Sequence, residues 1–259
     1  MSVADHTPSA GAHHLTGGLR VAVVIPAYRE ARLLPRTLSG IPPWVEHVVV
    51  VDDGSPDDTA QVAEAYAADD PRVDVVRLGQ NQGVGRAIVT GYARAVELGA
   101  EALVVMAADD QMDPDDLPAV LAPLVSGQAD YVKGERLSHP EAHRMPPVRR
   151  VGTRVLARLT GWASGLDGLD DTQCGYTALR RETFEALAPV HERLFPRYGY
   201  PNDLLIRLAE IDARVAQVTV RPVYADEVSG LRVHRVIVPI SGILLRGAAR
   251  RLRRRALGR

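Results

Sequence analysis

The sequence predicts an α/β protein built on a mostly parallel central sheet. Short segments rich in Val, with polar or turn residues on both sides, alternate with longer segments of helical periodicity. The expected strands are residues 21–25, 47–51, 73–78, 102–106, 131–134, 176–180 and 215–220. The first four are short and rich in Val, as expected for strands covered on both faces. With 259 residues, 46% of them hydrophobic, the chain can bury one large core, which favours a single domain over two small ones.

Helical periodicity fills the intervals between these strands and follows the later ones. The expected helices are residues 30–38, 57–68, 84–98, 148–163, 182–187 and 203–211. A repeated series of strand, helix and strand gives a parallel sheet, since the helix must cross over between neighbouring strands. No internal repeat is visible.

Charge is unevenly distributed along the chain. The formal net charge is −1, yet residues 246–259 hold seven arginines and no acid. A single basic stretch fits an anionic membrane surface or a phosphate better than nucleic acid, so no nucleic-acid partner is expected. Residues 234–259 are expected to form a basic amphipathic helix in the membrane interface, and a helix packed on the domain with a solvated end is the alternative. Its expected apolar face consists of Val236, Ile240, Ile243, Leu244 and Leu252.

The two ends of the chain and its single cysteine indicate where the protein resides. Residues 1–19 lack a basic start followed by an apolar core, so they are expected to be a disordered leader, not a signal peptide. Cys174 alone gives no disulfide framework, suits the cytosol, and is expected to pack as a small apolar residue. The longest nearly apolar run, residues 236–245, has about half the length needed to cross a bilayer. The expected location is therefore cytoplasmic, peripheral on the cytoplasmic face of the membrane.

Acidic residues follow several predicted strands at the point where each strand ends. The first strand runs into "PAYRE", the second into "DDGSPDDT" and the fourth into "AADDQMDP". Ligands of open parallel sheets bind beyond the carboxyl ends of the strands, so these acids are expected along one rim. Like charges gathered there repel. A divalent cation, Mg²⁺ or Mn²⁺, bound by Asp and Gln oxygens and by substrate phosphates, would remove that cost.

Five motifs in order resemble one known family. "VVIPAYRE", "VVVDDGSPDDT", "NQGVGRAI", "MAADDQMDP" and "DTQCGYTALRR" are similar to the signatures of family 2 glycosyltransferases, in particular the dolichyl- and polyprenyl-phosphate sugar synthases. The resemblance covers roughly residues 20–235 and implies a GT-A domain over 20–233, the Rossmann-like nucleotide-diphospho-sugar transferase fold. It implies an inverting enzyme that moves a hexose from a GDP- or UDP-sugar to a polyprenyl phosphate.

The resemblance also implies the residues of a donor site. The nucleotide-sugar set is Pro26, Tyr28, Glu30, Asp52, Asp53, Gly83, Gly85, Arg86 and Asp109. Asp109 and Gln111 match metal-associated positions of the family, but Ala107 stands where the family's D-x-D motif begins with aspartate. Either Asp110 compensates, or the metal is held by one carboxylate, Gln111, water and pyrophosphate.

The glycines of "NQGVGRAIVTG" also fit a dinucleotide-binding motif in part. That motif should follow the first strand and carry a third glycine where this chain has Ile88, so a dehydrogenase is not favoured. Gly83 and Gly85 are instead expected to let backbone amides approach the donor at a helix N-terminus, where anions are favoured.

The second half is expected to bind the acceptor. Residues 133–150 hold several arginines that can neutralise the donor pyrophosphate and an acceptor phosphate, although a solvated basic face is the alternative for each. Arg136 matches a family "GSR" position. Ser229 and Arg232 lie where relatives close the site with a "G-x-S-K"-like stretch, whose lysine is absent here. The expected acceptor set is Arg136, Arg149, Arg150, Ser229 and Arg232.

The acceptor decides the chemistry. A phosphate is already ionised and needs little help from a base, whereas a hydroxyl needs one. Asp203 and Asp171 are the candidate bases, and each can instead cap a neighbouring segment. Together with Asp109 and Arg136 they form the expected catalytic set. Transfer to a hydroxyl of a soluble natural product or glycan, or a catalytically weak nucleotide-sugar-binding protein, are the alternatives. A homodimer is left open.

Overall fold

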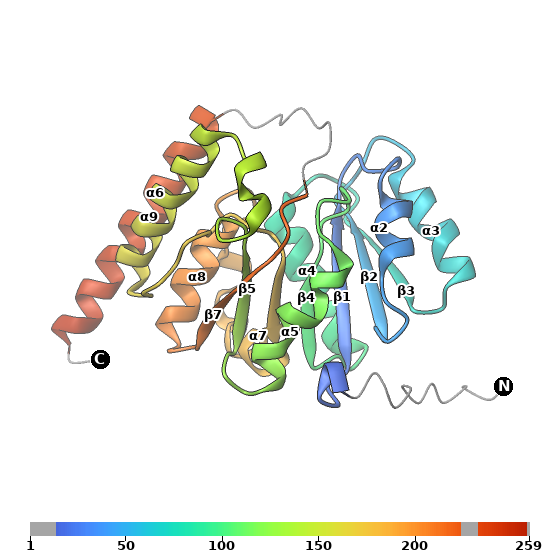
Figure 1. Cartoon of the computed structure of the whole chain (residues 1–259), viewed down its shortest axis with the longest axis horizontal. Coiled ribbons are helices and arrows are strands. Elements are labelled where there is room, and N and C mark those ends of the chain that lie inside the picture. The colour runs from blue at the N-terminus through green and yellow to red at the C-terminus, as the bar shows by residue number, and fades with distance from the viewer. Residues whose placement is uncertain (1–13, 224–232, 258–259) are drawn as a thin grey trace.

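A computed structural model describes residues 14–223 and 233–257 of the chain, which form an α/β fold around one twisted sheet (Figure 1). The sheet has seven strands in the order β3-β2-β1-β4-β6-β5-β7. The strands are β1 (Val21–Ala27), β2 (His47–Asp52), β3 (Val73–Arg77), β4 (Ala102–Val105), β5 (Tyr131–Glu135), β6 (Thr177–Arg180) and β7 (Val215–Thr219). All seven expected strands are present, and the prediction of a single α/β domain with a mostly parallel sheet is confirmed.

The helices cover both faces of this sheet. They are α2 (Leu34–Gly40), α3 (Thr59–Asp69), α4 (Val84–Glu97), α5 (Leu117–Val125), α6 (Pro147–Ser164), α7 (Arg181–Ala186), α8 (Tyr200–Glu210) and α9 (Val233–Ala256), with 3₁₀ turns η1 (Pro114–Asp116), η2 (Pro140–Arg144) and η3 (Ala188–Arg193). The sequence did not predict α5. Its segment "LPAVLAPLV" is apolar on all sides and includes Pro123, so it shows neither helical periodicity nor an unbroken helical composition.

The strand register places the functional loops along one edge. β1 pairs in parallel with β2 and β4, with Val24 opposite both Val49 and Val105. Parallel neighbours in this register end together, so the loops after β1, β2 and β4 emerge side by side at the upper edge in Figure 1. Only β6 runs antiparallel to its neighbours β4 and β5.

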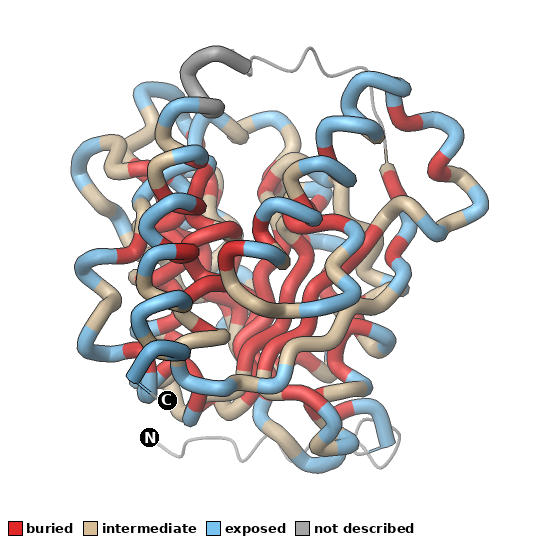
Figure 2. The backbone as a smooth tube through the Cα atoms, turned by 90° about the vertical axis from the view of Figure 1, so that its left-hand side faces the viewer, coloured by how far each residue is buried: buried red, intermediate tan, exposed pale blue. Residues whose placement is uncertain are grey.

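Two apolar layers hold the sheet, because alternate strand residues point to opposite faces. Val23 and Ile25 pack with Leu34 and Leu117 on one face, whereas Val24 packs with α4 and α8 on the other. Figure 2 shows the strands as the most deeply buried part of the chain.

Helices α6, α8 and α9 form a third cluster at one end of the sheet. Ile240, Ile243 and Leu244 of α9 are buried there against Ile206 of α8 and Ala163 of α6. The expectation that Ile240, Ile243 and Leu244 form a membrane-facing surface is therefore wrong, since they serve internal packing. The alternative, a helix packed on the domain, describes this part of α9. The side chain of Val236 lies outside the described residues.

The expected disordered leader also needs correction at its end. Thr16 is buried, Leu19 packs against the core, and Gly17 adopts a positive φ so close to Val125 of α5 that a Cβ would clash. Residues 14–19 are thus part of the folded domain. No helix among residues 14–223 and 233–257 is long and apolar enough to cross a membrane.

Candidate functional site

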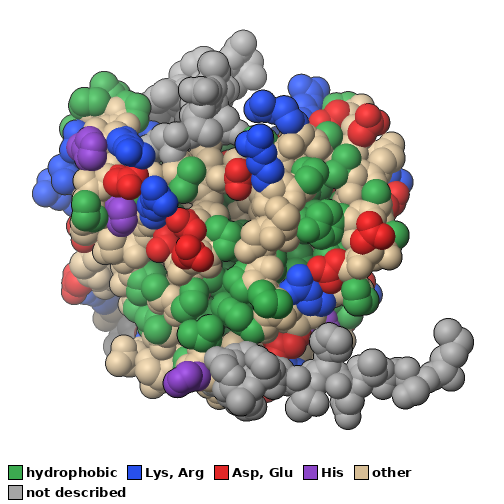
Figure 3. All heavy atoms as spheres, turned by 45° about the vertical axis from the view of Figure 1, so that its right-hand side comes forward, with side chains coloured by type: hydrophobic (Ala, Val, Ile, Leu, Met, Phe, Trp, Pro, Cys, Tyr) green, Lys and Arg blue, Asp and Glu red, His purple; other side chains and the backbone are tan. Residues whose placement is uncertain are grey.

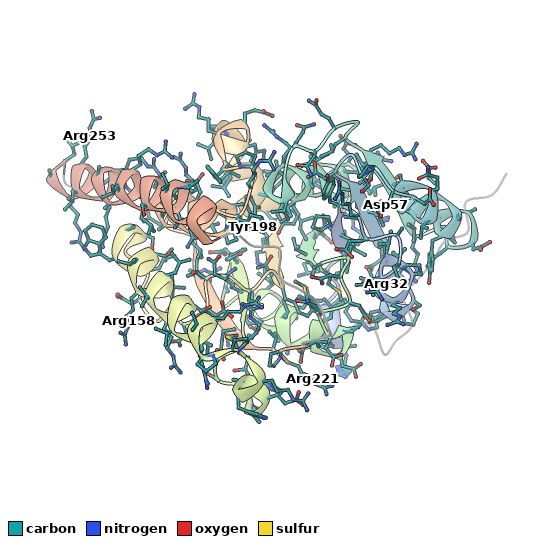
Figure 4. All side chains as sticks on the ribbon, turned by 90° about the horizontal axis from the view of Figure 1, so that it is seen from above. Arg32, Asp57, Arg158, Tyr198, Arg221 and Arg253 are labelled. Carbon is teal, nitrogen blue, oxygen red and sulfur yellow. The ribbon has the colours of Figure 1, made fainter. Side chains whose placement is uncertain are left out.

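Two cavities lie next to each other along the carboxyl edge of the sheet. The large cavity, of about 390 Å³, lies between the ends of β1 and β4 and the start of α4. The small cavity, of about 180 Å³, lies between the loop after β4, the segment before β6 and the end of β7. Figure 4 looks down on this edge and shows Tyr198, which lines the large cavity, near the middle of the molecule.

Asp109 lines both cavities and joins them. It stands four residues after β4, the central strand beside β1, and its Oδ1 accepts the Gln111 N–H at 3.2 Å. Gln111 lines the small cavity only. The predicted metal pair therefore lies where the two cavities meet.

The structure favours one of the two open alternatives for Ala107. Ala107 lines the large cavity, whereas Asp110 is exposed, lines neither cavity, and has a φ of 58° with its N–H donated to Thr37 Oγ1 at 3.2 Å. Asp110 is thus not placed to replace the missing aspartate. Asp109 and Gln111 remain as the oxygen donors at the junction.

These two residues fit a cation that is shared with a substrate. Within the described ranges, no group of three His, Cys, Asp or Glu side chains could hold a metal ion by itself. Mg²⁺ is commonly bound through one or two carboxylates and completed by substrate phosphates and water. Asp109 and Gln111 supply oxygen donors of the required kind beside a cavity large enough for phosphates.

The acids after β2 stabilise a loop. The Oδ1 and Oδ2 atoms of Asp53 accept the N–H groups of Gln82 and Gly83 at 2.7 and 2.8 Å, and Asp53 lines the large cavity while almost fully buried. Asp52 accepts the Ser55 N–H at 3.2 Å and lines neither cavity. The carboxylates of Asp52 and Asp53 therefore accept hydrogen bonds from backbone donors of the protein itself.

The glycines at the start of α4 allow two segments to pack closely. A Cβ on Gly85 would lie 2.6 Å from the Phe195 oxygen and 2.8 Å from Tyr200 Cβ, and the Gly85 N–H donates to the Pro196 oxygen at 2.9 Å. Because the amides of Gly83 and Gly85 already have protein acceptors, the expectation that they approach the donor does not agree with this structure. Gly83 does line the large cavity.

Four further predicted donor residues can be placed. Pro26, Tyr28 and Glu30 follow or end β1 and line the large cavity, as expected. Arg86 does not line it, and instead pairs with Glu192 at 2.8 Å. Its predicted role at the nucleotide stays a prediction, which its position outside this cavity does not support.

Arg136 lines the small cavity and is oriented by a buried carboxylate. Its Nε and Nη2 donate to Asp171 Oδ2 and Oδ1 at 2.8 and 3.2 Å. Asp171 is fully buried, and its Oδ1 also accepts the N–H groups of Gln173 and Cys174. Burial alone would raise the pKa of Asp171, but Arg136 and these N–H donors bring the pKa below its usual value. Asp171 is thus an ionised positioning residue, not the proton-accepting base considered from the sequence.

A buried lysine supports the same segment. Lys133 on β5 is 1% exposed, and its Nζ donates to the Cys174 oxygen at 2.6 Å. Burial lowers the pKa of Lys133 to about 8, and burial also raises the pKa of the Cys174 thiol. Cys174 therefore stays a neutral packed thiol, as expected from the sequence.

Asp203 lies behind the site. It is buried in the first turn of α8, lines neither cavity, and its Oδ2 accepts the Phe195 N–H at 3.0 Å. Arg207 lies 3.7 Å from its Oδ1. Burial raises the pKa of Asp203, although Arg207 opposes the shift. The carboxylate therefore anchors residues 195–199, and the prediction of a catalytic base here is not supported by its position.

The predicted acceptor residues have mixed outcomes. Arg149, near the start of α6, lines the small cavity with Arg136, whereas Arg150 lines neither cavity. Ser229 and Arg232 lie outside the described residues.

The sequence analysis missed several lining residues. Arg221 lines the small cavity directly after β7, and applying the strand-end rule to that strand would have found it. Gln173 and Tyr176 line the same cavity from the quoted "DTQCGYTALRR" motif. Arg197 and Tyr198 line the large cavity from a loop before α8, where no strand-end pattern indicates them.

Comparison with known proteins gives a family match and several relatives. Residues 22–187 match the family described as "Glycosyl transferase family 2". The chain is 32% identical to the undecaprenyl-phosphate mannosyltransferase of Micrococcus luteus, covering 78% of this chain and 83% of that protein. It is 31% identical to the polyprenol monophosphomannose synthase of Mycolicibacterium smegmatis, covering 90% of each.

A solved structure supports the fold. Glucosyl-3-phosphoglycerate synthase from Mycobacterium tuberculosis, crystallised with Mn²⁺, UDP and phosphoglyceric acid, superimposes with a TM-score of 0.69. The identity is 20%, and the match covers 92% of this chain and 81% of that one. The fold is thus the GT-A fold, in which a divalent metal accompanies the nucleotide in that neighbour. The match over residues 22–187 identifies this chain as a member of glycosyl transferase family 2, and it is a glycosyltransferase.

Proposed function

We propose that this enzyme transfers a hexose from a nucleotide diphosphate sugar to the phosphate group of a polyprenyl phosphate. Several relatives carry names that state such acceptors, among them an N-acetylglucosaminyltransferase of Methanococcus voltae named for dolichyl phosphate, which is 27% identical to this chain.

The observation that carries the proposal is the charge of the small cavity. Among the described residues, three arginines and a single carboxylate line it: Arg136, Arg149, Arg221 and Asp109. Such a lining favours an anionic acceptor, since arginine donates paired hydrogen bonds to phosphate oxygens. Of the other predicted acids, Asp171 and Asp203 are buried and accept hydrogen bonds from the protein itself. A phosphate acceptor needs no strong base, which fits this set of residues.

The donor is assigned to the large cavity on the other side of Asp109. Its diphosphate would then lie beside Asp109 and Gln111, which would hold Mg²⁺ or Mn²⁺ there. Such a cation would stabilise the negative charge of the departing nucleotide diphosphate. The nucleotide is UDP or GDP in this proposal.

In this proposal, arginines of the small cavity bind and orient the acceptor. The salt bridge to Asp171 fixes the guanidinium of Arg136, so little freedom is lost when it binds an anion. Arg136 and Arg149 orient the acceptor phosphate so that one oxygen faces the anomeric carbon. Attack from the side opposite the nucleotide inverts that carbon.

The physical state of the acceptor implies where the enzyme acts. A polyprenyl chain resides in a bilayer, so we place the protein as a peripheral enzyme on the cytoplasmic membrane surface.

A panel of acceptors tests the proposal. A prenyl phosphate and the matching prenyl alcohol should be offered with UDP- and GDP-sugars in Mn²⁺ or Mg²⁺. We expect transfer to the phosphate with at least one donor and none to the alcohol. Comparable transfer to the alcohol would overturn the assignment of the small cavity to a phosphate.

A further inference from the structure

The outer side of α6 carries a continuous apolar stripe. It consists of Val148, Val151, Val155, Leu159 and Trp162, spaced three or four residues apart. Such spacing places all five on one side of a helix. Val148 is 86% exposed and Trp162 is 57% exposed, although isolated surface apolar residues are common. A row of five on one helix instead indicates a contact surface.

Helix α9 lies beside α6 and also exposes apolar residues. Val238, Leu245 and Leu252 recur every seven residues and are exposed, while the buried residues of α9 face the third cluster. Arg251 donates to the Trp162 oxygen, which ties the end of α6 to α9. Figure 2 looks onto the side of the molecule where these two helices lie, and both show exposed outer surfaces.

The positive charge of α6 and α9 indicates an anionic partner. Together α6 and α9 hold eleven arginines and no acidic residue, in a chain whose formal net charge is −1. On the face in Figure 3, by contrast, acidic and basic side chains lie next to each other. In Figure 4, Arg158 of α6 and Arg253 of α9 extend outward from the body. Apolar residues flanked by arginines fit the interface of an anionic bilayer, in which the apolar side chains enter the acyl region and the guanidinium groups meet lipid phosphates.

The stripe begins at the small cavity. Val148 is adjacent in sequence to Arg149, which lines that cavity. A chain of hydrogen bonds connects the cavity with the C-terminal part of α6: Gln173 Nε2 donates to Asn202 Oδ1 at 3.1 Å, and Asn202 Nδ2 donates to Thr160 Oγ1 at 2.7 Å. The orientation of α6 is therefore fixed relative to the cavity.

We infer that the stripe on α6 docks the enzyme on an anionic lipid surface and thereby presents the small cavity to the membrane. This inference deepens the proposed function and rests on it for the identity of the acceptor as a lipid phosphate. The structure assigns the insertion to α6 and to the outer residues of α9, among which Leu252 also belongs to the α9 face that the sequence indicated.

The fluorescence of Trp162 tests the inference directly. The chain has two tryptophans, and Trp44 packs against the core, so a Trp44→Phe variant leaves Trp162 as the only tryptophan. With vesicles of phosphatidylglycerol and phosphatidylcholine, we expect its emission to shift to shorter wavelength and to be quenched by lipids brominated on the upper acyl chain. Co-sedimentation with vesicles without shift or quenching would overturn the proposal, and so would absence of vesicle binding.

A stripe variant separates the lipid from other partners. Val155→Ser/Leu159→Ser should weaken binding to the same vesicles by about tenfold or more, because two apolar groups no longer enter the acyl region. Leu15→Ser, at an exposed apolar residue away from α6, is the control and should bind as the parent does. Thermal unfolding checks that each variant is folded. Unchanged vesicle binding of the stripe variant, or a loss of dimer mass in its place, would contradict lipid docking.

Transfer assays with two acceptors separate the docking inference from the proposed function. With a short, water-soluble prenyl phosphate, the stripe variant should transfer sugar at the parental rate, whereas transfer to a long prenyl phosphate in vesicles should fall with binding. If the parent does not use the short acceptor, the proposed function fails, while sedimentation and quenching still decide whether α6 docks.

Discussion

The acidic residues at the two cavities are balanced by different partners. Asp53, at the large cavity, is neutralised by two backbone N–H groups, and Asp171, behind the small cavity, is neutralised by Arg136. Among the residues that the structure describes, Asp109 alone lines both cavities. Asp53 therefore stabilises a loop and Asp171 orients Arg136, whereas Asp109 is the acid whose position between the cavities suits a role in the chemistry.

The largest expected effect concerns Asp109 and its neighbour. Asp109→Ala should reduce sugar transfer by about 100-fold or more, because the junction loses its only carboxylate among the described lining residues. Asp110→Ala is the matched control and should stay within about twofold, since Asp110 is exposed and lines neither cavity. Steady-state transfer rates measure both. Equal losses would remove the distinction drawn between these adjacent aspartates.

The salt bridge behind the small cavity gives the next effect. Asp171→Asn should lower the free energy of unfolding by about 3 kcal/mol and slow transfer, because Arg136 would be left without its buried partner. Chemical denaturation measures the loss. Asp170→Asn, at the exposed neighbour, should change stability by less than about 0.5 kcal/mol. If Asp171→Asn were as stable as the parent, Asp171 would not be the anchor of Arg136.

The same pair predicts a dependence on pH. Because the folded-state pKa of Asp171 lies below its usual value of 3.8, the stability that it contributes is complete above about pH 5 and is lost as the pH falls through the folded-state pKa. Unfolding of the parent should therefore become easier between pH 5 and 3. Asp171→Asn should show a smaller slope over that range, and an identical slope would indicate that other carboxylates dominate.

Asp203 is expected to contribute to stability and not to proton transfer. Asp203→Ala should cost about 1–3 kcal/mol of stability, since the Phe195 N–H loses its acceptor. Its pH–rate profile for a phosphate acceptor should keep the parental shape, because no base is being removed. A lost basic limb in that profile would restore Asp203 as the catalytic base.

The last comparison concerns two glycines, one in tight packing and one in open space. Gly85→Ala should destabilise the protein by about 1–3 kcal/mol, since the new Cβ would overlap Phe195 and Tyr200. Gly152→Ala, in α6 with open space around it, should stabilise by about 0.5–1 kcal/mol. Thermal unfolding of both variants measures the difference. A tolerated Gly85→Ala would imply that this region relaxes more easily than its packing indicates.

The strands of the fold were more predictable than the contacts of the site residues. The valine-rich strands follow from local composition, and the strand-end rule located Asp109 and the residues after β1. That rule cannot tell whether Asp52 or Asp53 faces a ligand or a backbone N–H, because the answer depends on how the loop folds back. Family resemblance supplied Arg136, but its pairing with Asp171 depends on contacts between residues 35 positions apart.

Tertiary packing also decided which side of the C-terminal helix is exposed. Ile240, Ile243 and Leu244 have the composition of a membrane-facing surface, yet α6 and α8 cover them. The sequence periodicity of α9 does not indicate which side of the helix packs against its neighbours. For the same reason, the sequence does not indicate which side of α6 is exposed, and the packing of its opposite side against the domain defines the stripe.

Calorimetry of nucleotide binding tests the central claim that Asp109 joins the two cavities through a shared cation. UDP and GDP should be titrated into the parent, Asp109→Ala and Asp110→Ala, each with and without Mn²⁺. We predict that Mn²⁺ tightens binding of one nucleotide by about 5- to 150-fold in the parent and in Asp110→Ala, but not in Asp109→Ala. The same tightening in Asp109→Ala would contradict the account.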